Sequence, residues 1–448
     1  MKSIHLLALA LLAAAALPTP AHGQITERWL TQWGTATSDV GHGVAVDAAG
    51  TTWVTGYTSG SLGGANAGST DLFLTPLSTT GVLGTSVQRG GTSSELGYAA
   101  AVVGGNTVFD VGATSSTIWD GAAVIGSQDA VAVGYSTGGA YQSTTRWGST
   151  GGNDIAYAAA GNATHLLAAG RAIGAIDDQA QVGGQDAFVS KRTSTGALVW
   201  TRVVGSSSLD VAEAAAWDTA GNAYLAGITG GSLPTFTNAG STDLFLARYN
   251  ASGTQTLLRQ WGSSGTDVAH DMEVDLSGNI YLTGYTDGAL GGETNNGGID
   301  AFLTKLDSSG NVLWTRLLGG TSEEHSYGLA LDTAGRVWIG GYTQGSFAGH
   351  TNAGGNDAFV ALYDTAGTLL DTRFWGSTSS DQITGLAAVP DGSVSGSGYT
   401  FGTLGAANAG GPGISDAFAV SVTAVPEPGS AALLALGALG LLARRRWG

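Results

Sequence analysis

A glycine recurs every 57 residues along most of this chain, at Gly34, Gly91, Gly148, Gly205, Gly262, Gly319 and Gly376. A second glycine keeps nearly the same period, at Gly56, Gly112, Gly170, Gly227, Gly284, Gly341 and Gly398. An aspartate does so at Asp71, Asp129, Asp186, Asp243, Asp300, Asp357 and Asp416. Such a fixed period is typical of solenoids, propellers and other repeat arrays. Seven copies of one unit are therefore expected, and residues present in every copy are expected to be structural.

Each copy contains four short segments with the residue pattern of β-strands. In the fifth copy they span 256–261, 268–275, 279–286 and 300–307, with apolar and polar residues alternating in the last two. A D-x-x-G turn joins the second segment to the third, as at Asp275 to Gly278, where aspartate caps the turn and glycine accepts a positive φ. Four antiparallel strands repeated seven times predict an all-β, seven-bladed β-propeller.

The distribution of side-chain size predicts the strand order in each blade. The second segment is rich in alanine, as at 99–101 and 214–216, which suits the crowded axis. The first segment carries tryptophan, as at Trp33 and Trp261, which suits the wider rim. We therefore expect the order two, three, four, one from axis to rim. The first segment of the first copy spans 25–33, and no such segment follows Val422 at the other end. The N-terminal strand should therefore complete the last blade and close the ring.

Two motifs of the repeat resemble those of a known family. They are D-x-x-G-N-x-Y-L-x-G-Y-T at 275–286 and G-x-D-A-F-L-x-K-L at 298–306. The repeats resemble the SBBP propeller repeats of bacterial secreted proteins over about 25–424. The resemblance implies a propeller but no particular chemistry, because propellers host enzymes, scaffolds and binding proteins alike.

The N-terminus has the features of a secretory signal peptide. Lys2 precedes an apolar stretch at 6–17, and Ala21 to Gly23 forms a small-x-small cleavage pattern. We therefore predict a signal peptide at 1–23 and a propeller at 24–424.

The C-terminus, 425–448, has three consecutive parts. Val425, Pro426, Glu427 and Pro428 precede an apolar run at 429–443, which is followed by Arg444, Arg445 and Arg446. The run is shorter than the ~20 residues that span a bilayer comfortably, and the arginines would hold its end in the cytoplasm.

This tail resembles the PEP-CTERM sorting signal of Gram-negative bacteria. The resemblance implies a short transmembrane helix, transient attachment to the inner membrane and cleavage by an exosortase-type enzyme near Pro426 to Pro428. The protein would then be released or attached to the cell surface, in the context of exopolysaccharide production. A permanent C-terminal anchor is the alternative, and it has the same topology.

Composition narrows the classes of partner. The net charge of −17 repels nucleic acid and anionic lipid. With no cysteine, the chain has neither disulfides nor thiolate metal sites. We expect a monomer.

Acidic residues five positions after the repeat glycine are the main site candidates. They are Asp39, Asp210, Asp267, Glu324 and Asp381, while Leu96 and Asn153 hold this position in copies two and three beside Glu95 and Asp154. They precede the inner strand, so we expect them around one mouth of the central channel. They could bind calcium, which takes carboxylate oxygens, or cap local backbone N–H groups. Their repetition favours the capping role.

His42 and His270 share a second register near the channel, where other copies have Ala99, Ala156, Glu213, Tyr327 and Thr384. The two histidines belong to distant blades, so no metal site is expected. No nucleophile triad or phosphate-binding loop is present.

We therefore predict no catalytic residue, no cofactor and no enzyme. The expected role is binding or scaffolding in extracellular polymer, with exopolysaccharide or surface proteins as partners. Glycine- and asparagine-rich loops such as 287–299 and 344–356 would carry the affinity. The alternatives are a polysaccharide-active enzyme that uses the central channel and a matrix protein without a discrete ligand.

Overall fold

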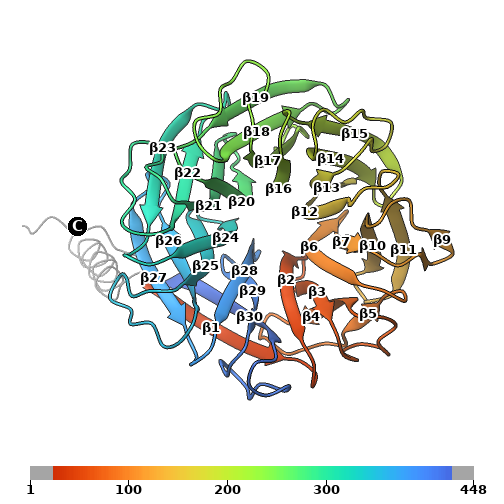
Figure 1. The fold of residues 1–448 in the computed structure, drawn as a ribbon. Helices are drawn as coiled ribbons and strands as arrows, with labels where there is room; N and C mark the ends of the chain where they lie inside the picture. Colours follow the sequence, from red (N-terminus) through yellow and green to blue (C-terminus); the bar gives the residue numbers. More distant parts are fainter. Residues whose placement is uncertain (1–23, 426–448) are drawn as a thin grey trace, which may run out of the picture. The chain divides into compact units, whose positions relative to one another are not determined.

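Seven four-stranded antiparallel sheets surround a central channel in the computed structural model, which describes residues 24–425 (Figure 1). This confirms the all-β, seven-bladed propeller. In every blade the alanine-rich second segment lies at the axis and the order is two, three, four, one, as predicted. The small side chains of the inner strands allow seven strands to converge at the axis. The outer strands, with larger side chains, cover the rim.

The strands of the blades follow in order from axis to rim. Blades one and two contain β2 (Asp39–Val46), β3 (Thr52–Thr58), β4 (Asp71–Leu77), β5 (Val87–Arg89), then β6 (Glu95–Val103), β7 (Thr107–Thr114), β10 (Asp129–Ser136) and β11 (Tyr141–Trp147). Blades three and four contain β12 (Ile155–Gly161), β13 (His165–Ala172), β14 (Asp186–Thr193), β15 (Leu198–Val204), then β16 (Asp210–Trp217), β17 (Ala223–Thr229), β18 (Asp243–Tyr249) and β19 (Gln255–Trp261).

Blades five and six contain β20 (Asp267–Val274), β21 (Ile280–Thr286), β22 (Asp300–Leu306), β23 (Val312–Leu318), then β24 (Glu324–Leu331), β25 (Val337–Thr343), β26 (Asp357–Tyr363) and β27 (Leu369–Trp375). Blade seven contains β28 (Asp381–Ala388), β29 (Val394–Thr400), β30 (Asp416–Val425) and β1 (Gln24–Trp33). A small hairpin of β8 (Ile118–Trp119) and β9 (Ala122–Ala123) extends one loop of blade two.

The N-terminal strand closes the ring, as predicted. β1 pairs with β30 as the outer strand of blade seven. It also contacts blade six, where the Ile25 N–H donates to Asp371 Oδ2 at 2.6 Å and the Trp375 Nε1–H donates to Glu27 Oε2 at 2.7 Å. The two ends of the propeller are thereby joined within blade seven, and β30, its third strand, is not left at an open edge.

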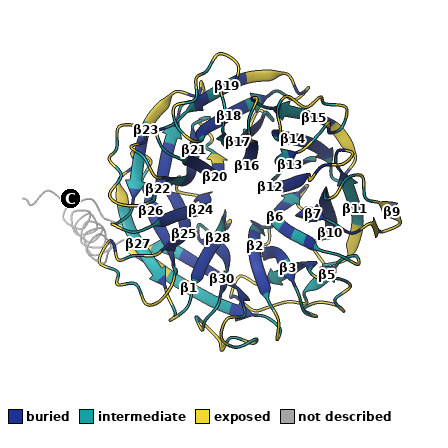
Figure 2. Cartoon of the chain, in the orientation of Figure 1, coloured by how far each residue is buried: buried dark blue, intermediate teal, exposed yellow. Residues whose placement is uncertain are grey.

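The core lies between neighbouring blades. The third strand of each blade carries a fully buried phenylalanine or a valine in its first half, as at Phe73, Phe245 and Phe302. One apolar cluster joins residues of blades four and five, from Ala214 to Phe302. Exposed residues are concentrated in the loops and on the outer strands (Figure 2).

The two faces of the ring differ. On one face, here called the turn face, tight D-x-x-G turns such as Asp47 to Gly50 join the strands. The other face, here called the loop face, carries the long loops before each third strand and the connections from one blade to the next. The sorting tail and the signal segment lie outside the described residues. Among residues 24–425, no helix is long and apolar enough to span a bilayer.

Candidate functional site

The predicted acids lie at the start of the inner strands on the loop face, but they do not ring the channel mouth. Asp39, Asp210, Asp267, Glu324 and Asp381 are each 0% exposed, and none lines the channel cavity. Each accepts a backbone N–H from four residues earlier at 2.5–2.6 Å. The position was wrong because each carboxylate turns away from the channel to cap the incoming loop.

The periodic aspartates lie beside these acids. Asp243 and Asp267 flank Gly262, where a Cβ would lie 2.5 Å from Asp243 Oδ1 and 2.7 Å from Asp267 Oδ2. Burial raises the pKa of Asp267, opposed by hydrogen bonds from Thr286 and Ser263, and the nearby Asp243 charge raises it further. The first repeat glycine is thus required by a junction between blades in which two buried carboxylates leave no room for a side chain.

The register of this junction shifts in blades two and three. Glu95 and Asp154 take the capping role there, accepting the N–H groups of Gly91 and Ser149 at 2.6 Å, in place of Leu96 and Asn153. In blade two it is Gly90 whose Cβ position would meet both carboxylates. Residues at the same distance from the repeat glycine in the sequence are therefore not always structurally equivalent.

Every inner strand contains a β-bulge near its loop-face end. The bulged residues are His42 with Gly43, Tyr98, Tyr157, Glu213, His270, Tyr327 and Thr384. The second repeat glycine is needed because the backbone of the inner strand comes very close at this bulge. A Cβ on Gly284 would overlap the Val268 carbonyl oxygen, and the corresponding glycines of the other blades make the same close approach. A bulge re-aims the side chain that it carries. Here it creates what we call the channel ring: His42, Tyr98, Tyr157, Glu213, His270, Tyr327 and Thr384.

The channel ring differs from blade to blade and forms two arcs. In one arc the rings of His42 and Tyr98 are 5.3 Å apart, and those of Tyr98 and Tyr157 are 5.2 Å apart. In the other, His270 Nδ1 lies 3.8 Å from Glu213 Oε2, and the His270 ring lies 4.5 Å from that of Tyr327. Such a set of aromatic and polar side chains offers flat apolar faces together with hydrogen-bonding groups.

One histidine of the channel ring, His42, and one beside it, His325, are held neutral. Burial lowers the pKa of His42 to about 4. It also lowers the pKa of His325 to about 4, with a smaller effect from His270. The His325 ring lies between Tyr285 and Tyr342, at 4.1 and 4.7 Å, and neither of its nitrogens has a hydrogen-bond partner among the described residues.

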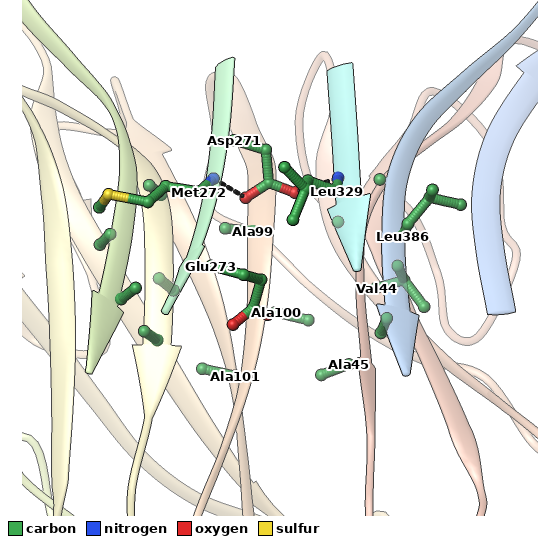
Figure 3. Close-up of a pocket in the computed structure, with 18 of the residues that line it drawn as sticks. Val44, Ala45, Ala99, Ala100, Ala101, Asp271, Met272, Glu273, Leu329 and Leu386 are labelled. Atoms are coloured by element: carbon green, nitrogen blue, oxygen red, sulfur yellow. Dashed lines mark hydrogen bonds between the residues drawn. The ribbon is translucent and has the colours of Figure 1, made fainter. Parts of the chain in front are cut away.

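Below the ring, toward the turn face, the channel contains a cavity of about 410 Å³. Its wall is mostly alanine, glycine, valine and leucine. Besides Glu213 of the channel ring, the acids that line it are Asp271 and Glu273 of blade five, which we call the acid pair (Figure 3). The bulge alignment gives glycine or alanine at both positions in the six other blades. The acid pair is therefore not a requirement of the repeat.

The two acids differ in their contacts. Asp271 accepts the backbone N–H of Leu329 at 2.7 Å, from the next blade, and that of Met272 at 2.8 Å. Glu273 is exposed to the cavity and forms no ion pair with a described residue. The enclosing wall raises the pKa of Asp271 to about 7 and that of Glu273 to about 8, the latter also through the charge of Asp271.

Sequence reasoning expected His42 and His270 near the channel, and His270 lines its cavity, but it assigned Ala99 and Ala156 where the structure has Tyr98 and Tyr157. It also missed the acid pair. The signal was present in His270 to Glu273, which replaces the alanine run of the other inner strands. Within residues 24–425, no group of three or more histidine, aspartate or glutamate side chains is arranged to hold a metal ion.

Two family models match parts of the chain. The PEP-CTERM protein-sorting motif matches residues 424–446, and a β-propeller repeat of the SBBP type matches residues 258–297. Regulatory protein FlaEY of Caulobacter vibrioides is 27% identical over 162 residues, which are 33% of this chain and 17% of that protein. The chain thus matches about a sixth of that relative's length.

Solved structures with a similar fold are more distant in sequence. YCF48 bound to D1 peptide has 11% identity and a TM-score of 0.44, covering 91% of this chain and 99% of that one. A fungal alcohol oxidase of the AA5 family in complex with copper has 12% identity and a TM-score of 0.42, covering 90% and 76%. At these values the likeness says nothing about ligand or reaction. The chain is thus a seven-bladed β-propeller that matches the SBBP repeat over residues 258–297 and the PEP-CTERM sorting motif over residues 424–446.

Proposed function

We propose that this protein is a non-enzymatic, surface-associated propeller that binds extracellular polysaccharide at its central channel. The PEP-CTERM motif implies export and membrane-associated sorting by an exosortase. The proposal adds a Gram-negative host, a final location at the cell surface or in its matrix, and a sugar polymer as partner.

The channel ring is the observation that carries this proposal. Seven bulges carry side chains of four different kinds, with tyrosine in three blades and histidine in two, whereas the capping residues are acidic in every blade. Tyrosine faces suit the apolar C–H face of a sugar, while Glu213, His270 and Thr384 can bond its hydroxyl groups. This moves the expected binding site from the long loops to the channel, because the loop aspartates and asparagines mainly bond their own backbone, as at Asn352 and Asp357.

A glycan array probed with the propeller, residues 24–424, tests the proposal. Tyr98→Ala should weaken binding at least about tenfold, whereas Tyr98→Phe should keep it, because the ring face remains. Tyr141→Ala, at an exposed outer-strand tyrosine, is the matched control and should bind as wild type does. Absence of binding to any glycan or to the host's own polymer would contradict the proposal and favour a matrix protein.

A polysaccharide-active enzyme is the second candidate, and the acid pair is the observation that favours it. Glycosidases use two carboxyl groups, one with a raised pKa. Asp271, however, already accepts two backbone N–H groups, which suits a structural role better than attack on a sugar. Release of reducing ends from polymer that is lost in Glu273→Gln would establish the enzyme. Binding without release supports the binding protein.

A further inference from the structure

We propose that the channel selects a sugar bearing a free amino group, with the ammonium held by the acid pair and by the tyrosine faces of the channel ring. This rests on the proposed function and names the class of polysaccharide.

The cavity is lined by three acids, Glu213, Asp271 and Glu273, and faces no lysine or arginine among the described residues. Two cations lie behind the lining: the Arg171 guanidinium is 5.8 Å from the centre of the Tyr157 ring, and Lys191 Nζ is 5.5 Å from that of Trp217. A narrow passage with low-dielectric walls concentrates the field of such groups. The ligand that complements it is a cation.

Aromatic faces add to this preference. Tyr98, Tyr157 and Tyr327 line the same cavity as the acid pair. The negative face of an aromatic ring attracts an ammonium, by about 0.5–2 kcal/mol depending on desolvation. A uronic acid would bring a like charge to the acid pair, and a neutral sugar would bring no cation to Glu273.

An independent observation places a polar ligand group at the channel mouth. His325 is 7% exposed, and both ring nitrogens lack a hydrogen-bond partner. Its ring stacks parallel to that of Tyr327, 6.2 Å away, which belongs to the channel ring. Its Nε2 lies 3.8 Å from Glu323 Oε2, too far for a hydrogen bond, and a buried imidazole without hydrogen bonds costs free energy. A sugar hydroxyl at the mouth would supply the missing hydrogen bond.

Protons take part in the binding. Because the pKa values of Asp271 and Glu273 are raised to about 7 and about 8, the acid pair is partly protonated near neutral pH. A bound ammonium favours the carboxylates, so a proton passes from the acid pair to solvent. The other ionisable groups that face the cavity are His270 on β20, Glu213 on β16, and Tyr98, Tyr157 and Tyr327 on β6, β12 and β24.

Titration calorimetry of the propeller at pH 6 tests the selection. The probes are a β-1,4-linked glucosamine oligomer, its N-acetylated counterpart and a glucuronate oligomer of equal length. We expect the amino oligomer to bind at least about tenfold more tightly than the N-acetylated one, with no binding of the glucuronate. In Glu273→Gln the preference should fall to about twofold or less. Glu293→Gln, which removes a carboxylate that pairs with Arg316 at the surface, should keep the preference.

Repeating the titration in two buffers of different ionisation enthalpy measures proton release. Wild type should release protons with the amino oligomer, and Glu273→Gln should release fewer. Equal affinity for the amino and N-acetylated oligomers, or an unchanged preference in Glu273→Gln, would overturn this inference while leaving polysaccharide binding intact. Failure of all oligomers and of the host polymer to bind would instead overturn the proposed function.

Discussion

Replacing one repeat glycine by alanine tests why the 57-residue period exists. In Gly262→Ala the new Cβ would lie 2.5 Å from Asp243 Oδ1 and 2.7 Å from Asp267 Oδ2. Neither carboxylate is free to move. Asp243 accepts from Ala239 N–H at 2.9 Å and Gln260 Nε2 at 3.0 Å, and Asp267 accepts from Ser263 N–H at 2.5 Å and Thr286 Oγ1 at 2.6 Å.

The cost follows from two contributions. Overpacking a buried site costs about 1–3 kcal/mol, and breaking a hydrogen bond to a buried charged group costs about 1.5–3 kcal/mol. The sum is about 2.5–6 kcal/mol. An unfolding entropy of about 2.1 cal/mol/K per residue gives about 1.2 °C per kcal/mol for a body of roughly 400 residues, so the expected fall in Tm is about 3–7 °C.

Differential scanning calorimetry of the propeller measures this fall. Gly184→Ala is the matched control, because an added Cβ there meets no atom within 4 Å and its φ is not in the left-handed region. Its Tm should stay within about 1 °C of wild type. Equal Tm values for Gly262→Ala and Gly184→Ala would refute the explanation of the glycine by the two carboxylates.

Further predictions concern closure, processing and charge. Deleting 24–33 should leave the outer edge of β30 unpaired and cause aggregation or a large fall in Tm. An unchanged Tm would contradict closure by β1. Intact mass of the protein from its host's medium should lack 429–448, whereas a mass that includes it would indicate a permanent anchor. Glu273 has a pKa of about 8 in the folded protein, above its ordinary value. As the pH rises from the ordinary value to about 8, ionisation of Glu273 therefore destabilises the fold. Glu273→Gln should match wild type in Tm near pH 4.5 and exceed it above pH 8, and a constant difference would contradict this. Calcium should bind weakly at most, and calorimetry showing a micromolar site lost in Asp267→Ala would contradict the capping role.

The repeated residues were sufficient to predict the fold, because each marks a geometric requirement present in all blades. Seven blades, the strand order and the closure of the ring could be predicted in this way. The signals were the glycines at 34 and 56 with their repeats, the D-x-x-G turns, and the lack of a first segment after the last copy. The residues shared by all blades predicted little about the site, since they are needed for junctions and turns.

The channel residues could not be placed in register from the sequence. A bulge inserts a residue without a mark of its own, and small shifts in blades two and three moved Tyr98 and Tyr157 out of the expected alignment. The direction of the capping acids also depends on N–H groups of the incoming loop, which a strand pattern does not show. Departures from the repeat, such as Asp271 and Glu273 in an alanine-rich strand, were the better signal of function.

The most direct test of channel binding is a crystal structure of the propeller with the oligosaccharide that binds most tightly on the array. The account predicts sugar density inside the channel, with a ring face against Tyr98 or Tyr327 and an amino group near Glu273. Sugar bound only to the long loops or to the outer strands, with the channel empty, would contradict it.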